Sequence, residues 1–186
     1  AGMHVVTPSN AADARGLMRA SIDANDPVIF IENILCYGLK AEDPGPGYRV
    51  PLGKAAIARE GTDISLITYG RTVLDALAVA DDLAKEGISV EVVDLRTIRP
   101  MDVDAITASV KKTSRCVVVE EGWEVCGVGA QVVDYVQRHC FDYLDAPVLR
   151  VHQADAPMPY TKSLEKAAKP DLPKTIAAIR QVLYLD

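Results

Sequence analysis

The sequence lacks two features that would point to particular partners, namely an excess of basic residues and a long apolar run. Its 186 residues include 20 Lys and Arg against 26 Asp and Glu, which gives a formal net charge of -6. A surface that binds nucleic acid needs a basic stripe instead. No apolar run approaches the roughly 20 residues that cross a bilayer. We therefore expect no nucleic-acid partner and no membrane association, and we interpret the chain as a soluble protein.

Paired cysteines are missing as well. None of the four cysteines belongs to a Cys-x-x-Cys pair, and the three histidines do not complete a zinc pattern. The cysteines are Cys36, Cys116, Cys126 and Cys140. We predict four reduced thiols, as is typical of intracellular proteins. Cys116 opens the apolar segment CVVVE and is expected to be a core residue.

A strand–helix–strand unit lies between residues 64 and 100. The segments ISLITYG and SVEVVD are rich in β-branched residues, as buried strands are. Between them, apolar residues recur at three- and four-residue spacing, which indicates a helix with Thr72 as its N-cap and Gly87 at its end. The short joints predict a right-handed crossover onto a parallel sheet. With 49% hydrophobic residues, the chain can bury the core of an α/β domain.

Residues 53–186 are predicted to form one three-layer α/β/α domain with a mostly parallel sheet. The further elements that we expect are a helix capped by Asp102, a strand at 116–121, a helix from Gly127, a strand at 148–152 and a final helix from Pro173. Residues 55–61 are predicted to form an antiparallel hairpin with the strand at 64–70. Two prolines keep residues 154–162 extended.

The first 33 residues predict an incomplete α/β unit. Strands at 4–9 and 27–33 flank a helix that Ser9 or Asn10 can cap. One helix and two strands bury little surface and leave open sheet edges, so this segment needs a partner sheet or further residues. Prolines and glycines then mark a linker. The predicted division is residues 1–33 as the end of one domain, 34–52 as linker, and 53–186 as the second domain.

Two motifs admit both a functional and a structural interpretation. Gly127-Val128-Gly129 at a helix start is part of a dinucleotide-binding fingerprint, but position 132 is Val instead of a third small residue, so we favour close helix–sheet packing. Glu120 and Glu121 could serve as acid and base at the end of a strand. We favour a solvated loop or a subunit contact, because no nucleophile or metal-ligand set accompanies them.

The remaining charged candidates are weaker. Asp94, Arg96 and Arg99 predict an internal ion-pair network at a strand end, with an anion site as the alternative. The histidines are scattered, and each is expected to be structural or solvent-facing: His4, His139 and His152. The residues alone thus indicate an α/β domain without a self-contained active site.

Several longer strings carry a resemblance to a known family. They are VVDLRTIRPMDVDAI, VVVEEGW followed by GVGAQV, YLDAPVLRV and ADAPMPYTKSLE. In this order, and over essentially the whole chain, they resemble the β subunit of the pyruvate dehydrogenase E1 component, a thiamine-diphosphate-dependent family. AGMHVVTPSNAADARGLM resembles the end of the family's pyrimidine-binding domain, and Gly53 onward resembles its transketolase C-terminal domain.

The resemblance implies a part in the oxidative decarboxylation of pyruvate and the reductive acetylation of E2 lipoyl groups. Thiamine diphosphate would be bound in a heterotetramer with E1 α subunits and a second β subunit. The family's activating glutamate and catalytic histidine precede the segment that resembles Ala1, so no catalytic or cofactor-binding residue is assigned, and we expect an inactive C-terminal fragment. The compartment implied is the mitochondrial matrix or a bacterial cytoplasm. Alternatives are a branched-chain 2-oxoacid or acetoin dehydrogenase β subunit, or a non-catalytic interaction module.

Two binding sites are also implied by the resemblance. The family holds a structural potassium ion with main-chain carbonyls, and the matching positions are Ser21, Ile22, Ala24 and Asp26. The family's β C-terminal domains dock the subunit-binding domain of the E2 acyltransferase. Asp145 and the chain-terminal Asp186 resemble its acidic contacts, which would suit a basic partner. For Asp145, a turn position before Pro147 is the alternative.

Overall fold

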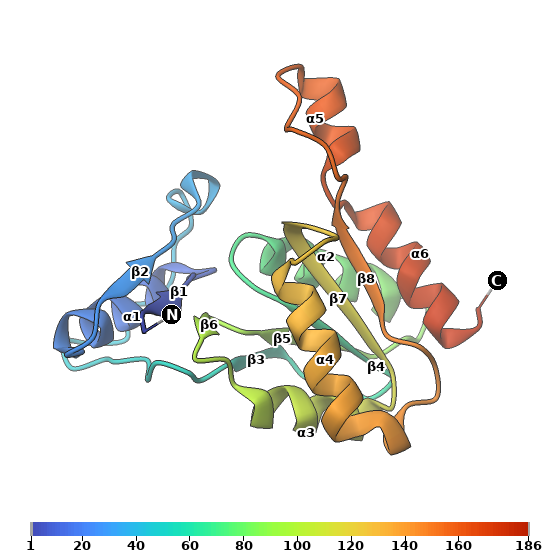
Figure 1. Ribbon diagram of the computed structural model, residues 1–186, viewed down its shortest axis with the longest axis horizontal. Helices are drawn as coiled ribbons and strands as arrows, with labels where there is room; N and C mark the ends of the chain where they lie inside the picture. Colours follow the sequence, from blue (N-terminus) through green and yellow to red (C-terminus); the bar gives the residue numbers. More distant parts are fainter. Residues whose placement is uncertain (1, 186) are drawn as a thin grey trace.

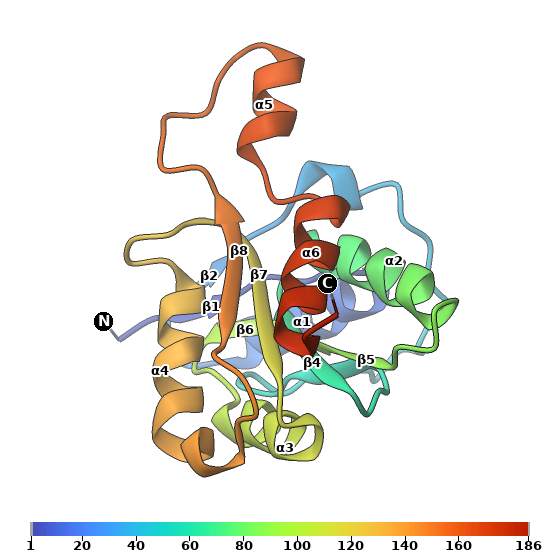
Figure 2. The same ribbon diagram turned by 90° about the vertical axis from the view of Figure 1, so that its right-hand side faces the viewer.

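A five-stranded sheet in the order β3-β5-β4-β7-β8 forms the centre of the computed structural model, which describes residues 2–185 (Figures 1 and 2). Its strands are β3 (Ala56–Arg59), β4 (Ile64–Thr68), β5 (Val90–Asp94), β7 (Cys116–Trp123) and β8 (Leu149–Gln153). Four strands run parallel, and only the edge strand β3 is antiparallel to its neighbour. The parallel strands are rich in Val, Ile and Leu because both faces of such a sheet are covered.

Helices cover both faces of this sheet. They are α2 (Thr72–Ala84), α3 (Val103–Thr113), α4 (Val128–Cys140) and α6 (Leu172–Leu183). On one face, Leu66 of the sheet shares a core with Leu83 of α2 and Ile179 of α6. On the other face, Ile67 shares a core with Ile106 of α3 and with residues of α4. This arrangement confirms the predicted three-layer α/β/α architecture.

Two local predictions are wrong. β3 pairs with β5, where Ile57 lies opposite Val93, and it does not form a hairpin with β4. β4 is a central strand with parallel neighbours on both sides, so no edge is left for a hairpin partner. Thr72 is the first residue of α2 and not its N-cap. Its hydroxyl donates to the carbonyl of Tyr69 at 2.8 Å.

Residues 154–169, which we call the arm, leave the end of β8 and return to the start of α6. The stretch predicted to be extended contains bends and a turn in which the N–H of Ala156 donates to the carbonyl of Ala154 at 2.8 Å. The arm then contains α5 (Lys162–Ala168), a helix that the sequence patterns did not predict. Figures 1 and 2 show α5 standing away from the sheet and its helices. The N–H of Ala154 donates to the carbonyl of Ala168 at 2.8 Å, which closes the base of the arm.

The amino-terminal segment lies beside this domain and shares a small sheet with it (Figure 1). The elements are β1 (His4–Val6), α1 (Ala11–Asp23), β2 (Val28–Phe30), the 3-10 helix η1 (Ile34–Cys36) and β6 (Thr97–Arg99). β1 is parallel to β2 and antiparallel to β6. β6 therefore supplies the partner that the first strands were predicted to need. Asn10 caps α1 as expected, since its Oδ1 accepts the N–H of Asp13 at 2.9 Å.

The four cysteines are all free, and Cys116 is buried in the core, as predicted. Cys126 is exposed in the loop before α4, with a positive φ of 58°. Among residues 2–185, the helices are too short or too polar to span a bilayer.

Candidate functional site

The carboxyl ends of β4 and β7 lie side by side where the order of the parallel strands reverses, which is the place where ligands bind in many open α/β sheets. Glu120, near the end of β7, is only 1% exposed. Its Oε1 accepts from Gly129 N–H and from Arg150 Nη2, both at 2.9 Å, and its Oε2 accepts from the Tyr69 hydroxyl at 3.0 Å. The prediction of a solvated or subunit-contact glutamate is therefore wrong for Glu120. Its carboxylate is engaged by three internal donors.

The two glycines before and within the first turn of α4 allow this arrangement. A Cβ atom at Gly129 would lie 2.5 Å from Glu120 Oε1, and one at Gly127 would lie 2.7 Å from the same atom. The N-terminus of a helix attracts anions, and here the anion is a side chain of the protein itself. The preferred interpretation of Gly127-Val128-Gly129, close helix–sheet packing, is confirmed. Burial and the neighbouring Glu120 carboxylate raise the pKa of the Tyr69 hydroxyl, so Tyr69 remains a donor.

A second buried polar cluster joins the amino-terminal segment to the domain. Arg96 Nε and Nη2 each lie 2.9 Å from a carboxylate oxygen of Asp13 in α1. Asp94 accepts from Ser9 Oγ at 2.5 Å and from the N–H of Arg96 at 2.9 Å. Burial raises the pKa of the Asp94 carboxyl from its usual value to about 6. The predicted ion-pair network is thus present for Arg96, but its partner is Asp13, and Arg99 instead lines an open cleft with His4 and Asp26.

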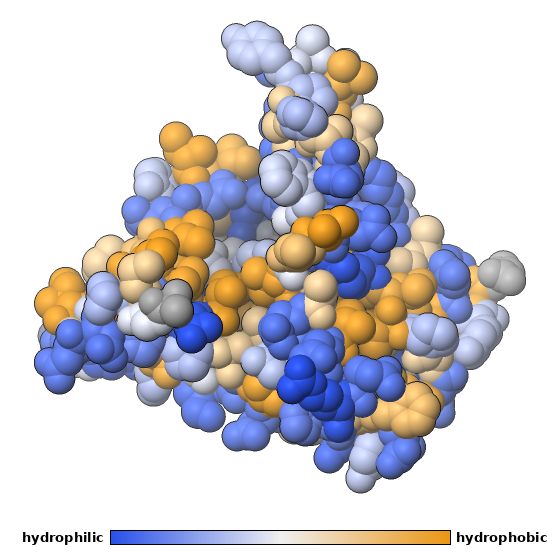
Figure 3. Space-filling view, viewed as in Figure 1, coloured by the Kyte–Doolittle hydropathy of each residue, from blue (hydrophilic) through white to orange (hydrophobic). Residues whose placement is uncertain are grey.

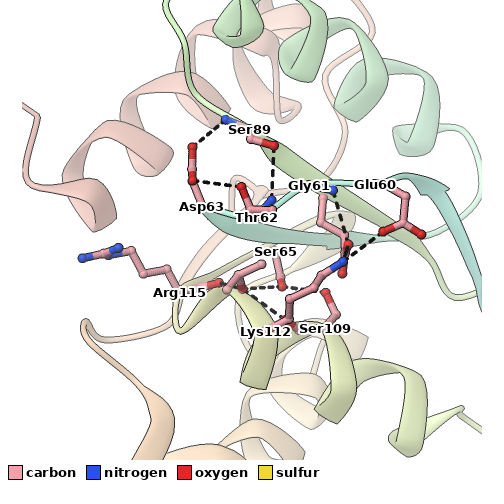
Figure 4. Close-up of polar contacts among 11 residues, drawn as sticks. Glu60, Gly61, Thr62, Asp63, Ser65, Ser89, Ser109, Lys112 and Arg115 are labelled. Carbon is pink, nitrogen blue, oxygen red and sulfur yellow. Dashed lines mark hydrogen bonds and ion pairs between the residues drawn. The ribbon is translucent and has the colours of Figure 1, made fainter.

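A third buried cluster, which sequence reasoning missed, lies at the opposite, amino end of the parallel strands (Figure 4). The buried Glu91 of β5 forms an ion pair with Lys112 of α3, which also contacts Glu60. Next to them, Ser65 Oγ lies 2.6 Å from Ser109 Oγ. A carboxylate and a serine inside otherwise apolar strands were the available signals. The carboxylates of all three clusters are paired within the protein and so act in the fold, whereas the buried Nε of Arg150 in the first cluster has no hydrogen-bond partner within the described residues.

The three histidines do not converge. His4 Nε2 lies 3.5 Å from Asp26 Oδ2, and His152 Nε2 lies 4.0 Å from Glu124 Oε2. His139 is exposed on α4. Over residues 2–185, no three of the His, Cys, Asp and Glu side chains are placed to hold a metal ion together.

The four positions matched to a potassium ion lie together at the end of α1. Ser21 and Ile22 belong to its last turn, Ala24 is its C-cap with an extended backbone, and Asp26 follows two residues later. The last four carbonyls of a helix have no N–H partner within the helix. Main-chain oxygens are donors of the kind that suits a hard cation. The local backbone therefore fits the ligand chemistry that the resemblance implies.

Asp145 lies in the turn before β8, between Ser114 and the end of α6. Its N–H donates to the carbonyl of Ser114 at 2.9 Å, and its side chain is 56% exposed with Oδ2 3.5 Å from Arg115 Nη2. The hydroxyl of Tyr184 donates to the Asp145 carbonyl at 3.2 Å. Asp145 is thus both a turn residue and an accessible carboxylate beside the end of the last helix. The other predicted contact, Asp186, lies outside the described residues.

The fold and these clusters define a transketolase-type C-terminal α/β domain, in which a mostly parallel sheet carries internally paired acids at both ends. The family model described as transketolase, C-terminal domain, matches residues 53–174, and the chain belongs to this family. A solved structure titled "Split gene transketolase, inactive beta4 tetramer" has the same fold, with a TM-score of 0.79 and 23% identity over 99% of this chain and 58% of that one.

More particularly, the chain is similar to pyruvate dehydrogenase E1 component subunit beta from several organisms. It is 44% identical to the mitochondrial protein of Dictyostelium discoideum over 97% of this chain and 52% of that protein. It is 46% identical to the mitochondrial protein of Mus musculus, over 99% of this chain and 53% of that protein. It is 45% identical to the Rhizobium meliloti protein, over 98% and 40%. These matches confirm the resemblance, and the chain spans about half the length of the curated relatives that it matches.

Proposed function

We propose that this chain is the carboxyl-terminal part of a pyruvate dehydrogenase (acetyl-transferring) E1 β subunit. The observation that carries the proposal is the 44–46% identity to such subunits over 97–99% of the chain. The intact protein would take part in the oxidative decarboxylation of pyruvate and the reductive acetylation of E2 lipoyl groups. The relatives reported above carry pyruvate dehydrogenase names, which favours this reaction over a branched-chain 2-oxoacid or acetoin dehydrogenase and over a non-catalytic module.

The cofactor of the intact heterotetramer is proposed to be thiamine diphosphate, which supplies a carbanion-stabilising ring when it is bound. The residues of this chain do not fit a diphosphate site at the glycine motif, because Glu120 already accepts the N–H of Gly129 at 2.9 Å. We therefore assign no cofactor contact to this chain. Its proposed contribution is assembly with E1 α and a second β subunit.

The proposed division of the chain places residues 1–33 in a domain that continues upstream. Several large apolar side chains of this segment are exposed: Met3, Met18, Ile22, Ile29 and Ile31. The strand β2 is also an open edge of its sheet. Exposed apolar groups and open edges of this kind need covering, and the preceding half of the protein is the proposed cover. Potassium held by the carbonyls of residues 21–26 would brace this joint, and KCl should then stabilise the chain more than NaCl does.

The proposed E2 contact lies at the other end of the molecule. Support comes from the accessible carboxylate of Asp145 and from Tyr184, which holds the end of α6 against it. Charge-assisted hydrogen bonds to a basic E2 domain suit such a surface. The relatives include mitochondrial and bacterial proteins, and the proposed compartment is a mitochondrial matrix or a bacterial cytoplasm.

The test compares three preparations with pyruvate as substrate: the 186-residue chain alone, the chain with the E1 α subunit from the same source, and that α subunit with the full-length β subunit. We expect turnover only in the third, with pyruvate preferred over branched-chain 2-oxoacids and acetoin. Turnover by the chain alone would refute its assignment as a scaffold part. A preference of the full assembly for another substrate would refute the assignment to pyruvate.

A further inference from the structure

A cleft opens between the arm and the carboxyl ends of β4 and β7. It encloses about 340 Å³ and is walled by α5, by the starts of α2 and α6, by η1 and by the end of β7. We call it the arm cleft. A smaller hollow of about 120 Å³ shares Arg71 and Glu121 with it and extends to Thr7 of the amino-terminal segment. The arm cleft lies where the order of the parallel strands reverses, which is where ligands commonly bind in open α/β sheets.

The arm cleft is lined by many charged side chains, most of which are engaged by their neighbours. The engaged groups are Arg71, whose two terminal nitrogens both donate to Asp75, Lys169, which lies 2.6 Å from Glu165, and Asp171, which caps α6 by accepting the N–H of Lys174 at 2.9 Å. Three charged groups of the cleft are left over, because Lys162, Lys166 and Glu121 form no ion pair within residues 2–185. The arm cleft therefore keeps two free cations and one free carboxylate.

These three groups come from two walls of the cleft. Lys162 and Lys166 are four residues apart on α5, so they share a face of that helix with their Cβ atoms about 5–6 Å apart. Glu121 is half-buried at the end of β7. Leu35 and Leu172 add apolar surface to the walls. Figure 3 shows apolar and hydrophilic residues side by side on the arm, which projects from the rest of the surface.

The complement of this arrangement is a small ligand with two negative groups a few ångströms apart and one positive group. Charge-assisted hydrogen bonds from both lysines would hold the negative groups, and the Glu121 carboxylate would accept from the positive group. A simple dianion fits less well, because it would face the Glu121 carboxylate without a cation between them. A short aliphatic chain between the charged groups would lie against the two leucines.

We propose that the arm cleft binds an acidic α-amino acid, whose two carboxylates pair with Lys162 and Lys166 and whose ammonium group pairs with Glu121. The proposal goes beyond the proposed function and depends neither on the α subunit nor on pyruvate turnover. It can therefore fail while the proposed enzymatic role stands, and the reverse also holds.

Calorimetric titration of the 186-residue chain tests the ligand class. We expect saturable 1:1 binding of L-glutamate with a Kd below about 1 mM. Glutarate lacks the ammonium group and L-glutamine lacks the second carboxylate, so each should bind at least about tenfold more weakly. Absence of saturable L-glutamate binding overturns the proposal. Glutarate or inorganic phosphate binding as tightly as L-glutamate also overturns it, because the cleft would then be an unselective anion site.

Variants test the assigned contacts. Glu121→Gln should weaken L-glutamate binding at least about tenfold and leave glutarate binding equal or tighter, because a repulsive carboxylate is removed. Lys162→Gln combined with Lys166→Gln should weaken both ligands at least about tenfold. The controls are Glu42→Gln and Lys40→Gln, which change exposed charges outside the cleft. Equal weakening by the controls, or unchanged L-glutamate binding in the cleft variants, refutes the assignment.

Amide hydrogen exchange shows whether the ligand bridges the two walls. The hydrogen bond from the Ala154 N–H to the Ala168 carbonyl closes the base of the arm, and a ligand that joins α5 to Glu121 would add a second attachment. With L-glutamate at ten times its Kd, exchange in α5 should slow by about tenfold. Glu121→Gln should lose this protection. Binding that leaves exchange in α5 unchanged would place the ligand outside the arm cleft and overturn the proposal.

Discussion

Oε1 of Glu120 in β7 and Nη2 of Arg150 in β8 lie 2.9 Å apart beneath the first turn of α4. The same carboxylate receives the N–H of Gly129 and the hydroxyl of Tyr69. The end of β4, the start of α4 and the edge strand β8 are thus tied to one buried anion. A buried charge is tolerated only when it is paired and hydrogen-bonded. Arg150 Nη2, which pairs with this anion, also donates to the carbonyl of Trp123 at 3.4 Å.

Replacing Arg150 by Met should destabilise the protein by about 3–5 kcal/mol, because it leaves the Glu120 carboxylate buried without its cation. Urea unfolding followed by circular dichroism would measure the loss. The control is Arg138→Met, which removes an exposed helical ion pair with Asp134 and should cost less than about 1 kcal/mol. Similar losses for the two variants would contradict the importance that we give to the buried pair.

Gly129→Ala should destabilise the protein by about 1–3 kcal/mol, although alanine is the better helix former. The added Cβ would lie 2.5 Å from Glu120 Oε1 and would push α4 off the carboxylate. Gly38→Ala is the matched control, because a Cβ there meets nothing within 4 Å. We expect the control to stay within about 0.5 kcal/mol of the parent protein. Unfolding midpoints that coincide for all three proteins would show that α4 can move at no cost.

The raised pKa of Asp94 gives a pH dependence with a defined sign. Burial raises its folded-state pKa from 3.8 to about 6, so the folded state holds the proton more tightly than the unfolded state does. Its contribution to stability is therefore fully present below pH 3.8 and is lost as the pH rises through about 6, by about 3 kcal/mol in total. Asp94→Asn should flatten the dependence of unfolding free energy on pH between about 4 and 6.5.

The exposed Asp104 of α3 provides the comparison for this experiment. Asp104→Asn should retain the slope of the parent protein across the same pH window, because Asp94 keeps its buried site in that variant. The unfolding free energy of the parent, measured relative to that of Asp94→Asn, should fall between about pH 4 and 6.5. If it does not fall, the result argues against a protonated Asp94 in the folded state.

The elements that could be predicted from the sequence are those with local signals. The strand, helix and strand at β4, α2 and β5 followed from β-branched runs and helical spacing, which depend only on nearby residues. The partner of β3 did not, because a short strand can pair with any open edge of its sheet. α5 was missed because its seven residues follow two prolines, which favoured an extended interpretation of the whole stretch.

The buried clusters required knowledge of distant contacts. Glu120 ends an apolar run and looked solvent-facing, while Arg150 lies 30 residues away inside the strand VLRVH. Only the adjacency of β7 and β8 brings the two charges together, and the sequence carries no local signal of that pairing. Two glycines opposite one strand-end glutamate were the available hint. The network at Asp94 was half predictable for the same reason, since Arg96 lies two residues from Asp94, whereas Asp13 lies 83 residues from Arg96.

Asp145 gives the sharpest test of the proposed E2 contact. Arg115 and the Tyr184 hydroxyl hold its turn, and its carboxylate remains accessible. Asp145→Asn removes one charge without changing shape, so calorimetric titration with the basic subunit-binding domain of E2 should show at least about tenfold weaker binding. The difference should shrink as salt is raised. Asp142→Asn, three residues away and also exposed, should bind like the parent. Equal affinities for the parent and both variants would place the E2 contact elsewhere on the domain.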